Sequence, residues 1–348
     1  MLMVAVAAVA PVLAACGSSS KKSGGSATIN GAGSTLAAPI YMQWGSKLAS
    51  QGVTVNYAAV GSGAGVAQFT AGTTNFAASD PPLKDSEEAA LKKGAPVHIP
   101  TVLGAITVSY NLPGVKTGLK LDGKAIANIF LGKIKSWNDP AIGKLNPGVK
   151  LPSTAITVVH RSDSSGTTAG FTTFLTDYSP TWKSQVGTNK DVKWPTGTGA
   201  KGNSGVAAAI KQTTGAVGYV EQAYALQNAF TFADVKNKAG QFVAPALAST
   251  SAAASGLTIP ADLRFKAINS PNPTAYPIVS QTFIIVYKDL CKGGMTPSQA
   301  KAMVKFLNYG LGAGQSVAQQ LSYAPLPPAL LSKAQAAVSS LTCNGSPA

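Results

Sequence analysis

Three segments rich in glycine and hydroxyl residues have the composition of anion-binding loops. They are residues 31–36, 61–65 and 161–168, and each stands between an expected strand and the helical pattern that follows it. Glycine lets the backbone approach a ligand closely, and the start of a helix offers free N–H donors at the positive end of its dipole. Any one of these segments also fits an ordinary turn. Three of them together favour a site for an oxyanion.

Two charged residues near these segments carry the prediction further. Arg161 has a planar guanidinium that matches the shape of an oxyanion, and Asp163 follows two residues later, where its carboxylate can hold that fork in place. The alternative is an ordinary surface ion pair, worth less than about 1 kcal/mol. Asp80 ends another expected strand, where a carboxylate would be expected to repel an anion. The alternative for Asp80 is a turn-forming residue before Pro81.

Short apolar strands alternate with helical patterns along the chain. A strand is expected over 53–57, a helix over 66–71 and an extended segment over 75–79. This order is typical of an α/β fold. The Ala- and Ser-rich segment 246–255 is expected to be a loop. The same order recurs in three later pairs of a strand and a helix: 106–110 with 123–131, 156–160 with 167–176, and 282–287 with 297–311.

Composition and charge restrict the class of function. Hydrophobic residues make up 45% of the 348 residues and charged residues 12%, which excludes a long coiled coil or a disordered polyelectrolyte. The 28 Lys and Arg against 13 Asp and Glu give a formal net charge of +15, which favours anionic partners. Arg161 and Arg264 are the only arginines and no basic run occurs, so nucleic-acid binding is not expected. The lysine excess also fits a soluble surface outside the cytoplasm.

The first 15 residues form an apolar leader that is too short to span a membrane. Cys16 follows it, and Leu13-Ala14-Ala15-Cys16 resembles the lipobox of bacterial lipoproteins. Residues 16–26 form a flexible Gly/Ser-rich linker that begins with this cysteine. We expect a signal peptide over 1–15 and a lipid on Cys16 that anchors the protein to the outer face of the cell membrane. A coincidental cysteine after an apolar leader is the alternative. The leader lacks a positively charged start, so we expect that translation begins upstream or that the chain was trimmed.

The other two cysteines, Cys291 and Cys343, are expected to form a disulfide in an extracytoplasmic protein, and two unpaired buried cysteines are the alternative. No cysteine or histidine cluster has metal-ligand spacing and no phosphate-loop lysine motif occurs, so no metal or cofactor is expected. His160 is the sole candidate for a catalytic base. A strand-end residue beside the site is the preferred interpretation of His160.

The segments above, in this order and spacing, resemble the phosphate-binding subunits of bacterial phosphate importers, which are type II periplasmic binding proteins. The resemblance covers nearly the whole chain after the linker. It implies two Rossmann-like α/β lobes with a ligand cleft between them, joined by two crossing strands, with lobe I formed by 27–104 plus 280–348 and lobe II by 105–279. It also includes Val55-Asn56-Tyr57 and the segments 129–139, 144–148, 193–195, 202–205 and 218–221.

The resemblance implies a set of phosphate ligands, with Asp163 bracing Arg161. Leu36 stands where this family often has Phe, and Ala37 where Pro is common. Because the contact at Leu36 would come from the backbone N–H, we expect this exchange to alter packing more than anion binding. The implied ligands are Thr35, Leu36, Ser62, Asp80, Arg161, Ser165, Gly166 and Thr167.

Asp80 separates the expected function from its alternatives. Phosphate near neutral pH still carries a proton and can donate a hydrogen bond to a carboxylate, whereas sulfate can only accept one. The resemblance implies delivery of the bound anion to the permease of an ABC-type importer. Together with Asp80, it leads us to expect a monomeric, non-enzymatic protein that binds inorganic phosphate for such an importer. The alternatives are a binding protein for another tetrahedral oxyanion, such as sulfate, and a secreted phosphatase.

Overall fold

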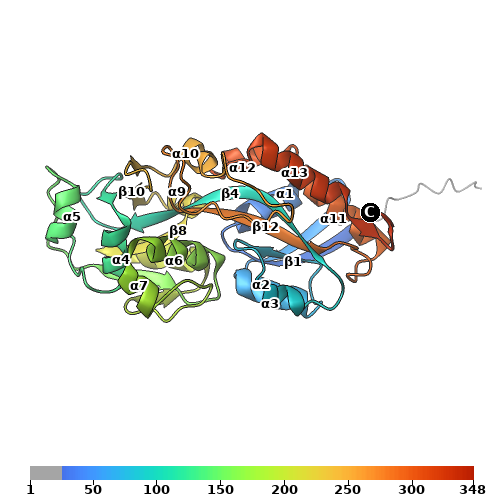
Figure 1. The fold of residues 1–348 in the computed structure, drawn as a ribbon, viewed down its shortest axis with the longest axis horizontal. Helices are drawn as coiled ribbons and strands as arrows, with labels where there is room; N and C mark the ends of the chain where they lie inside the picture. The colour runs from blue at the N-terminus through green and yellow to red at the C-terminus, as the bar shows by residue number, and fades with distance from the viewer. Residues whose placement is uncertain (1–25) are drawn as a thin grey trace, which may run out of the picture.

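The computed structural model describes residues 26–348 of the chain, drawn in Figure 1. Its first part alternates strands and helices and ends in the longest strand. These elements are β1 (Ala27–Gly33), α1 (Ala38–Ala49), β2 (Val53–Ala58), α2 (Ser62–Thr70), β3 (Phe76–Ser79), α3 (Asp85–Ala89) and β4 (Pro96–Tyr110).

The middle part of the chain combines helices with short strands. These elements are β5 (Lys120–Leu121), α4 (Gly123–Phe130), α5 (Pro140–Leu145), β6 (Thr157–Arg161), α6 (Gly166–Tyr178), α7 (Pro180–Gln185), β7 (Thr198–Ala200), α8 (Gly202–Gln212), β8 (Ala216–Glu221), α9 (Gln222–Gln227), β9 (Thr231–Phe232), β10 (Asp234–Lys236), β11 (Phe242–Val243) and α10 (Leu247–Ala252).

The last part returns to the first. Its elements are β12 (Val279–Tyr287), α11 (Pro297–Gly310), α12 (Gly314–Gln320), α13 (Pro328–Ser339), β13 (Thr342–Cys343) and β14 (Ser346–Pro347).

Most strands join one nine-stranded sheet in the order β2-β1-β3-β12-β4-β8-β6-β7, with β9 also beside β4. β1 runs parallel to β2 and β3, and β6 runs parallel to β7 and β8. The long strand β4 pairs with β12 up to Ala105 and with β8 from Ile106 onward. β4 and β12 therefore run through the middle of the molecule, between a half built around β1 and a half built around β6 (Figure 1).

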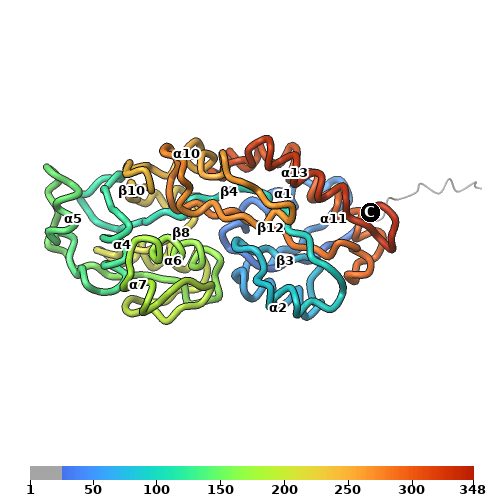
Figure 2. Tube along the Cα trace, viewed as in Figure 1, coloured from blue at the N-terminus to red at the C-terminus, as the bar shows by residue number. Residues whose placement is uncertain are grey.

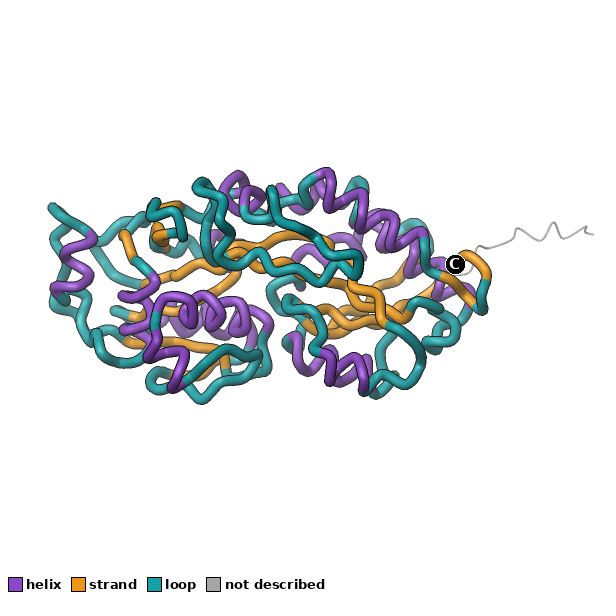
Figure 3. Tube along the Cα trace, viewed as in Figure 1, coloured by secondary structure: helices purple, strands orange, loops and turns teal. Residues whose placement is uncertain are grey.

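Helices cover the strands in both halves, as Figure 3 shows. In the first half the C-terminal helices lie beside the early part of the chain, seen as red next to blue in Figure 2. The apolar spacing of α1 explains this packing, because Tyr41 and Trp44 fall on its buried face. Trp44 meets the ring of Phe306 on α11 with 6.1 Å between the centroids. In the second half, Phe171 and Tyr219 stack at 4.3 Å.

Three elements differ from the sequence prediction. β4 begins at Pro96 rather than near residue 106, because nearly all of this strand is buried and so shows no alternation of apolar and polar residues. The helix expected from residue 66 begins at Ser62, directly after Gly61, whose φ of 95° makes the turn into the helix. Residues 246–255, expected to be a loop, contain the short helix α10, whose start is capped by the hydroxyl of Ser249 accepting from the amide of Ala246 at 3.0 Å.

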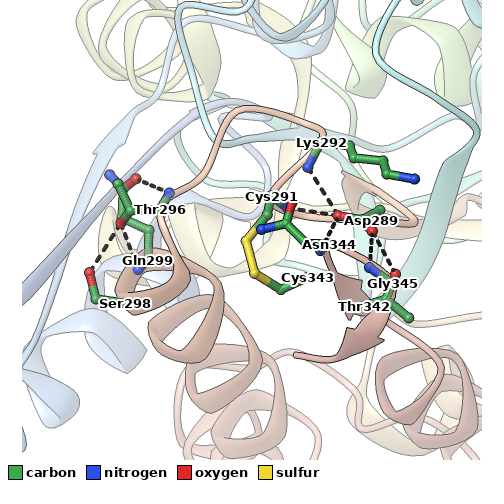
Figure 4. Close-up of a disulfide and its surroundings, with 10 residues drawn as sticks. All are labelled: Asp289, Cys291, Lys292, Thr296, Ser298, Gln299, Thr342, Cys343, Asn344 and Gly345. Atoms are coloured by element: carbon green, nitrogen blue, oxygen red, sulfur yellow. Dashed lines mark hydrogen bonds between the residues drawn. A yellow bond between two sulfur atoms is a disulfide. The ribbon is translucent and has the colours of Figure 1, made fainter.

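Cys291 and Cys343 form a disulfide with their Cα atoms 4.7 Å apart, so this expected pair is present (Figure 4). Beside it, the carboxylate of Asp289 accepts hydrogen bonds from the amides of Asn344 and Gly345. The disulfide and Asp289 together attach the C-terminal tail to the segment after β12.

Within residues 26–348, no helix has both the length and the apolar character needed to cross a bilayer. Cys16 and the leader lie outside the described residues, so the expected lipid anchor remains a prediction.

Candidate functional site

The candidate site lies at the carboxyl ends of parallel strands, where open α/β sheets place their ligands. Thr35 follows β1 and Asp80 follows β3, both in the first half of the molecule. In the second half, Arg161 ends β6 and Ser165 caps the start of α6. Ser62, from the predicted segment 61–65, lies at the start of α2 in the first half. The local order of strand, turn and helix thus points all of these segments at one place.

The two halves of the molecule meet at Gly166. A methyl group added there would lie 2.3 Å from Oδ2 of Asp80 and 2.4 Å from Oγ of Ser62, so only glycine fits this position. Beside it, the amide of Gly63 donates to the carbonyl of Ser164 at 3.0 Å. The structure therefore brings the predicted residues of both halves into direct contact.

Arg161 is almost fully buried and is held by Asp163. Nε of Arg161 donates to Oδ1 at 2.7 Å, and Nη2 donates to Oδ2 at 2.5 Å. The guanidinium also lowers the pKa of Asp163 below its usual value, against the opposing effect of burial. Nη1 faces the hydroxyl of Thr167 at 3.4 Å. Since a guanidinium has five N–H donors, Arg161 keeps several for a ligand after Asp163 is satisfied.

Asp80 is 1% exposed and belongs to the same cluster. The hydroxyl of Ser34 donates to its Oδ1 at 2.5 Å, and its Oδ2 lies 3.5 Å from Oγ of Ser62. Burial raises the pKa of Asp80 to about 6, although the Ser34 hydrogen bond and the charge of Arg161 oppose the shift. A buried carboxylate with a raised pKa is suited to share a proton with a ligand.

Backbone amides supply further donors. Within residues 26–348, the amides of Thr35 and Leu36 have no hydrogen-bond acceptor, nor do those of Gly166 and Thr167 in the first turn of α6. The first amides of a helix lack partners in their own helix and form a natural anion site. These four N–H groups belong to residues that the resemblance to the importer subunits implies as ligands.

Three tyrosines hold the loop after β1 in this orientation. The carbonyls of residues 34–36 accept hydrogen bonds at 2.7, 2.8 and 2.7 Å from the hydroxyls of Tyr57, Tyr224 and Tyr323, respectively. The carbonyls of Ser34 and Thr35 share their planar peptide groups with the free amides of Thr35 and Leu36, so the bonds from Tyr57 and Tyr224 also fix these two amides. The sequence analysis named Tyr57 only within the segment 55–57 and missed Tyr224 and Tyr323, since nothing in their local sequence connects them with residues 34–36.

Two other residues of the cluster were also missed or left uncounted. Ser34 lies in the predicted segment 31–36 but is not among the implied ligands, and its hydroxyl donates to Asp80. Asn203 at the start of α8 contacts both Thr35 and Thr167 through its side-chain amide. A sequence signal for Asn203 existed, because it stands in a Gly-Asn-Ser-Gly segment that opens a helix, like the predicted segments.

His160 and Arg264, which the sequence analysis also named, make other contacts. The ring of His160 stacks on Trp194 with 4.7 Å between centroids, and Nδ1 donates to the carbonyl of Arg161 at 3.0 Å. Burial lowers the pKa of His160, which favours its neutral form. Arg264 forms ion pairs with three carboxylates in a different cluster, at Asp85, Glu88 and Asp262.

Comparison with known proteins gives one consistent group. The family model described as the PBP superfamily domain matches residues 18–312. The chain is 44% identical over 313 residues to the phosphate-binding protein PstS of Pasteurella multocida, covering 89% of each chain. It is 41% identical over 283 residues to the phosphate-binding protein PstS of Methanocaldococcus jannaschii, covering 76% of this chain and 72% of the other.

Solved structures share the fold. A high-affinity periplasmic phosphate-binding protein bound with phosphate matches with a TM-score of 0.74 at 24% identity, covering 91% of this chain and 96% of the other. A phosphate-binding protein from Stenotrophomonas maltophilia matches with a TM-score of 0.67 at 22% identity, covering 89% and 93%. At these identities the likeness shows the architecture alone, which is a mixed α/β fold of the type II periplasmic binding class.

Proposed function

Because the chain belongs to the PstS family of phosphate-binding proteins, within the PBP superfamily, we propose that it binds inorganic phosphate outside the cytoplasm and delivers it to the permease of an ABC-type importer. The observation that carries this proposal is the position of Asp80 among hydrogen-bond donors. One buried carboxylate faces a cluster of amides, hydroxyls and one guanidinium. Such a cluster suits an anion that accepts most of its hydrogen bonds and donates one.

The proposed ligands divide into donors and one acceptor. Asp80 accepts the hydrogen bond of the phosphate proton, while Asp163 orients Arg161 without touching the anion. Since only one guanidinium supplies a full positive charge in this set, the remaining donors neutralise the anion incompletely, which permits its release to a transporter. The proposed donors are Thr35, Leu36, Ser62, Arg161, Ser165, Gly166 and Thr167.

We assign residues 27–104 and 280–348 to lobe I and residues 105–279 to lobe II. The change of partner along β4, from β12 to β8 between Ala105 and Ile106, supports this boundary. Phosphate would then hold the cleft closed by bonding to both lobes. An ion pair outside the site would also hold the two lobes together, because Lys190 pairs with Glu87 across the proposed boundary.

Hydrolysis of phosphate esters is not part of the proposal. His160 directs Nδ1 to a backbone carbonyl and stacks on Trp194, which leaves it poorly placed to activate a nucleophile. A sulfate-binding protein is the second candidate because most of the donors would serve either anion. The buried carboxylate argues against it, since sulfate has no proton to offer Asp80 near neutral pH.

Calorimetric titration of residues 26–348, first freed of endogenous phosphate, tests the function. We expect one phosphate per chain, much weaker binding of sulfate, and no release of product from a chromogenic phosphate ester. Failure to bind phosphate at millimolar concentration, or turnover of the ester, would contradict the proposal.

The proposed location follows from the leader and the family. We propose that Cys16 carries a lipid after removal of residues 1–15 and that residues 16–26 tether the domain to the outer face of the membrane. Intact mass of the exported protein tests this, since a diacylglycerol-type addition should map to Cys16. Monomeric behaviour in size-exclusion chromatography with light scattering is the expected state of the released domain.

A further inference from the structure

Asn203 connects two hydroxyls from opposite sides of the candidate site. Its Nδ2 donates to Oγ1 of Thr35 at 2.9 Å and to Oγ1 of Thr167 at 3.2 Å. Its backbone amide, at the start of α8, also donates to Oγ1 of Thr35 at 3.2 Å. Asn203 is fully buried, and both threonines are at least 94% buried, so water cannot easily replace these bonds.

The side-chain amide of Asn203 has only one orientation that satisfies its surroundings. Its Oδ1 accepts a hydrogen bond of 3.0 Å from the backbone amide of Glu221. Rotating the group by 180° would set an NH₂ against that N–H and leave both donors facing each other. The Glu221 amide therefore directs the NH₂ group of Asn203 to the two threonines.

This arrangement decides the direction in which the threonine hydroxyls point. A hydroxyl has one hydrogen to donate and two lone pairs that accept. Oγ1 of Thr35 accepts twice from Asn203, and Oγ1 of Thr167 accepts from Asn203 and, at 3.4 Å, from Nη1 of Arg161. Both hydroxyls have their lone pairs in use, so the hydrogen is what each has left to offer.

We propose that Asn203 is a positioning residue that sets the hydroxyls of Thr35 and Thr167 as hydrogen-bond donors toward an oxyanion. The inference rests on the proposed function, since an anion is the ligand that needs such donors. A hydroxyl free to rotate can present a lone pair to the anion, which is repulsive. Asn203 removes that alternative for one hydroxyl on each side of the cleft.

The surroundings of Asn203 are built to hold it there. Gly202 has a φ of 71°, a backbone conformation that residues with a side chain rarely adopt. The amide of Gly202 donates to Oδ1 of Asp163 at 3.0 Å. The carboxylate that orients Arg161 therefore also holds the loop that carries Asn203.

The first test replaces Asn203 by Asp, which has nearly the same size but no hydrogen to donate. Both threonine hydroxyls should then turn toward the new carboxylate. We expect the phosphate dissociation constant to rise by about 10- to 100-fold or more, because two donors are lost and a negative charge is added. Ser204→Ala, which alters an exposed neighbour on α8, is the matched control and should bind phosphate like wild type.

The second test separates positioning from a general structural role. Asn203→Ala is measured in the wild-type chain and in a Thr35→Val/Thr167→Val chain that lacks both hydroxyls. If Asn203 acts through the hydroxyls, its removal should weaken phosphate binding severalfold in the first chain and by less than about twofold in the second. Thermal unfolding without phosphate shows that each variant is folded.

The outcomes distinguish two failures. If wild type binds phosphate and Asn203→Ala costs the same factor in both chains, the inference is wrong and the proposed function stands. If Asn203→Asp binds phosphate as wild type does, the inference is also wrong. If wild type binds no phosphate, the proposed function and the inference fail together.

Discussion

Arg161 and Asp163, two residues apart on the loop that leaves β6, form a two-bond ion pair with distances of 2.7 and 2.5 Å. The pair fixes the plane of the guanidinium and aims its remaining N–H groups at the place where Thr167 and the free amides of α6 converge. Because both partners are mostly buried, the geometry of the fork matters more here than its charge.

Arg161→Lys should therefore weaken phosphate binding although it keeps the charge. A lysine ammonium cannot bond to Asp163 in two places and reach the anion as well, so at least one charge-assisted bond is lost. The expected cost is about 1.5 to 3 kcal/mol, or about 10- to 150-fold in the dissociation constant. Calorimetry measures it, with Arg264→Lys at the other, more exposed arginine as the control. Equal affinities for wild type and a folded Arg161→Lys variant would place Arg161 outside the site.

Asp80→Asn should reduce the discrimination between phosphate and sulfate. The amide removes the negative charge and can donate to a sulfate oxygen, which relieves the repulsion that excludes sulfate. Phosphate affinity itself should change modestly, because a lost acceptor and a lost repulsion oppose each other. The quantity to measure is the ratio of the two dissociation constants at one pH and ionic strength. Asp177→Asn, at an exposed carboxylate, should leave that ratio unchanged, and a ratio unaffected by Asp80→Asn would make Asp80 only a turn residue.

The raised pKa of Asp80 predicts a pH dependence of the same ratio. Above about pH 6 the carboxylate is mostly ionised and repels sulfate, and below it the protonated group can donate to sulfate. Sulfate should therefore bind more tightly, relative to phosphate, as the pH falls through about 6. The Asp80→Asn variant is the control. Phosphate still changes its protonation with pH in that experiment, but residue 80 no longer does. Parallel curves for wild type and variant would exclude Asp80 as the titrating group.

The same shift has a consequence for the ligand-free protein. The pKa of Asp80 is raised in the folded state above its usual value of 3.8, so the folded state holds the proton more tightly than the unfolded one. The resulting stabilisation is present below about pH 4 and is lost as the pH rises through about 6. We expect the difference in unfolding free energy between wild type and Asp80→Asn to shift in favour of wild type on acidification across this range. Urea titrations at several pH values measure it, and a constant difference would contradict the raised pKa.

Replacing Cys291 and Cys343 together by Ser should lower stability without changing the site. The disulfide closes a loop across a sequence separation of 52 residues, and removal of such a crosslink costs about 2 to 4 kcal/mol. Neither cysteine contacts a proposed ligand, so the phosphate affinity of the folded variant should equal that of wild type. Thermal unfolding with and without reductant checks the first expectation and calorimetry the second. If the unfolding temperature of the wild-type protein does not change with reductant, the crosslink contributes little to stability.

The sequence by itself determined the α/β class, the anion-binding character and the segments that carry it. These follow from short-range physics: glycines and hydroxyls at a strand-to-helix turn create free amides, and two residues suffice to pair Arg161 with Asp163. Resemblance to importer subunits added which residues of each segment to expect at the site. The start of β4 was misplaced because burial on both faces leaves no local period, and α10 was missed because a short segment rich in Ala and Ser shows none either.

Tertiary structure alone decided how the donors are oriented. Asn203 reaches Thr35 across 168 positions of sequence, and Tyr224 and Tyr323 reach the carbonyls of residues 35 and 36 across 189 and 287 positions. The pKa of Asp80 is likewise set by burial beneath segments from both halves of the molecule, Gly166 among them. Local sequence can specify which groups a loop offers, but hydrogen-bond direction and desolvation depend on neighbours that only the packing of distant segments brings into contact.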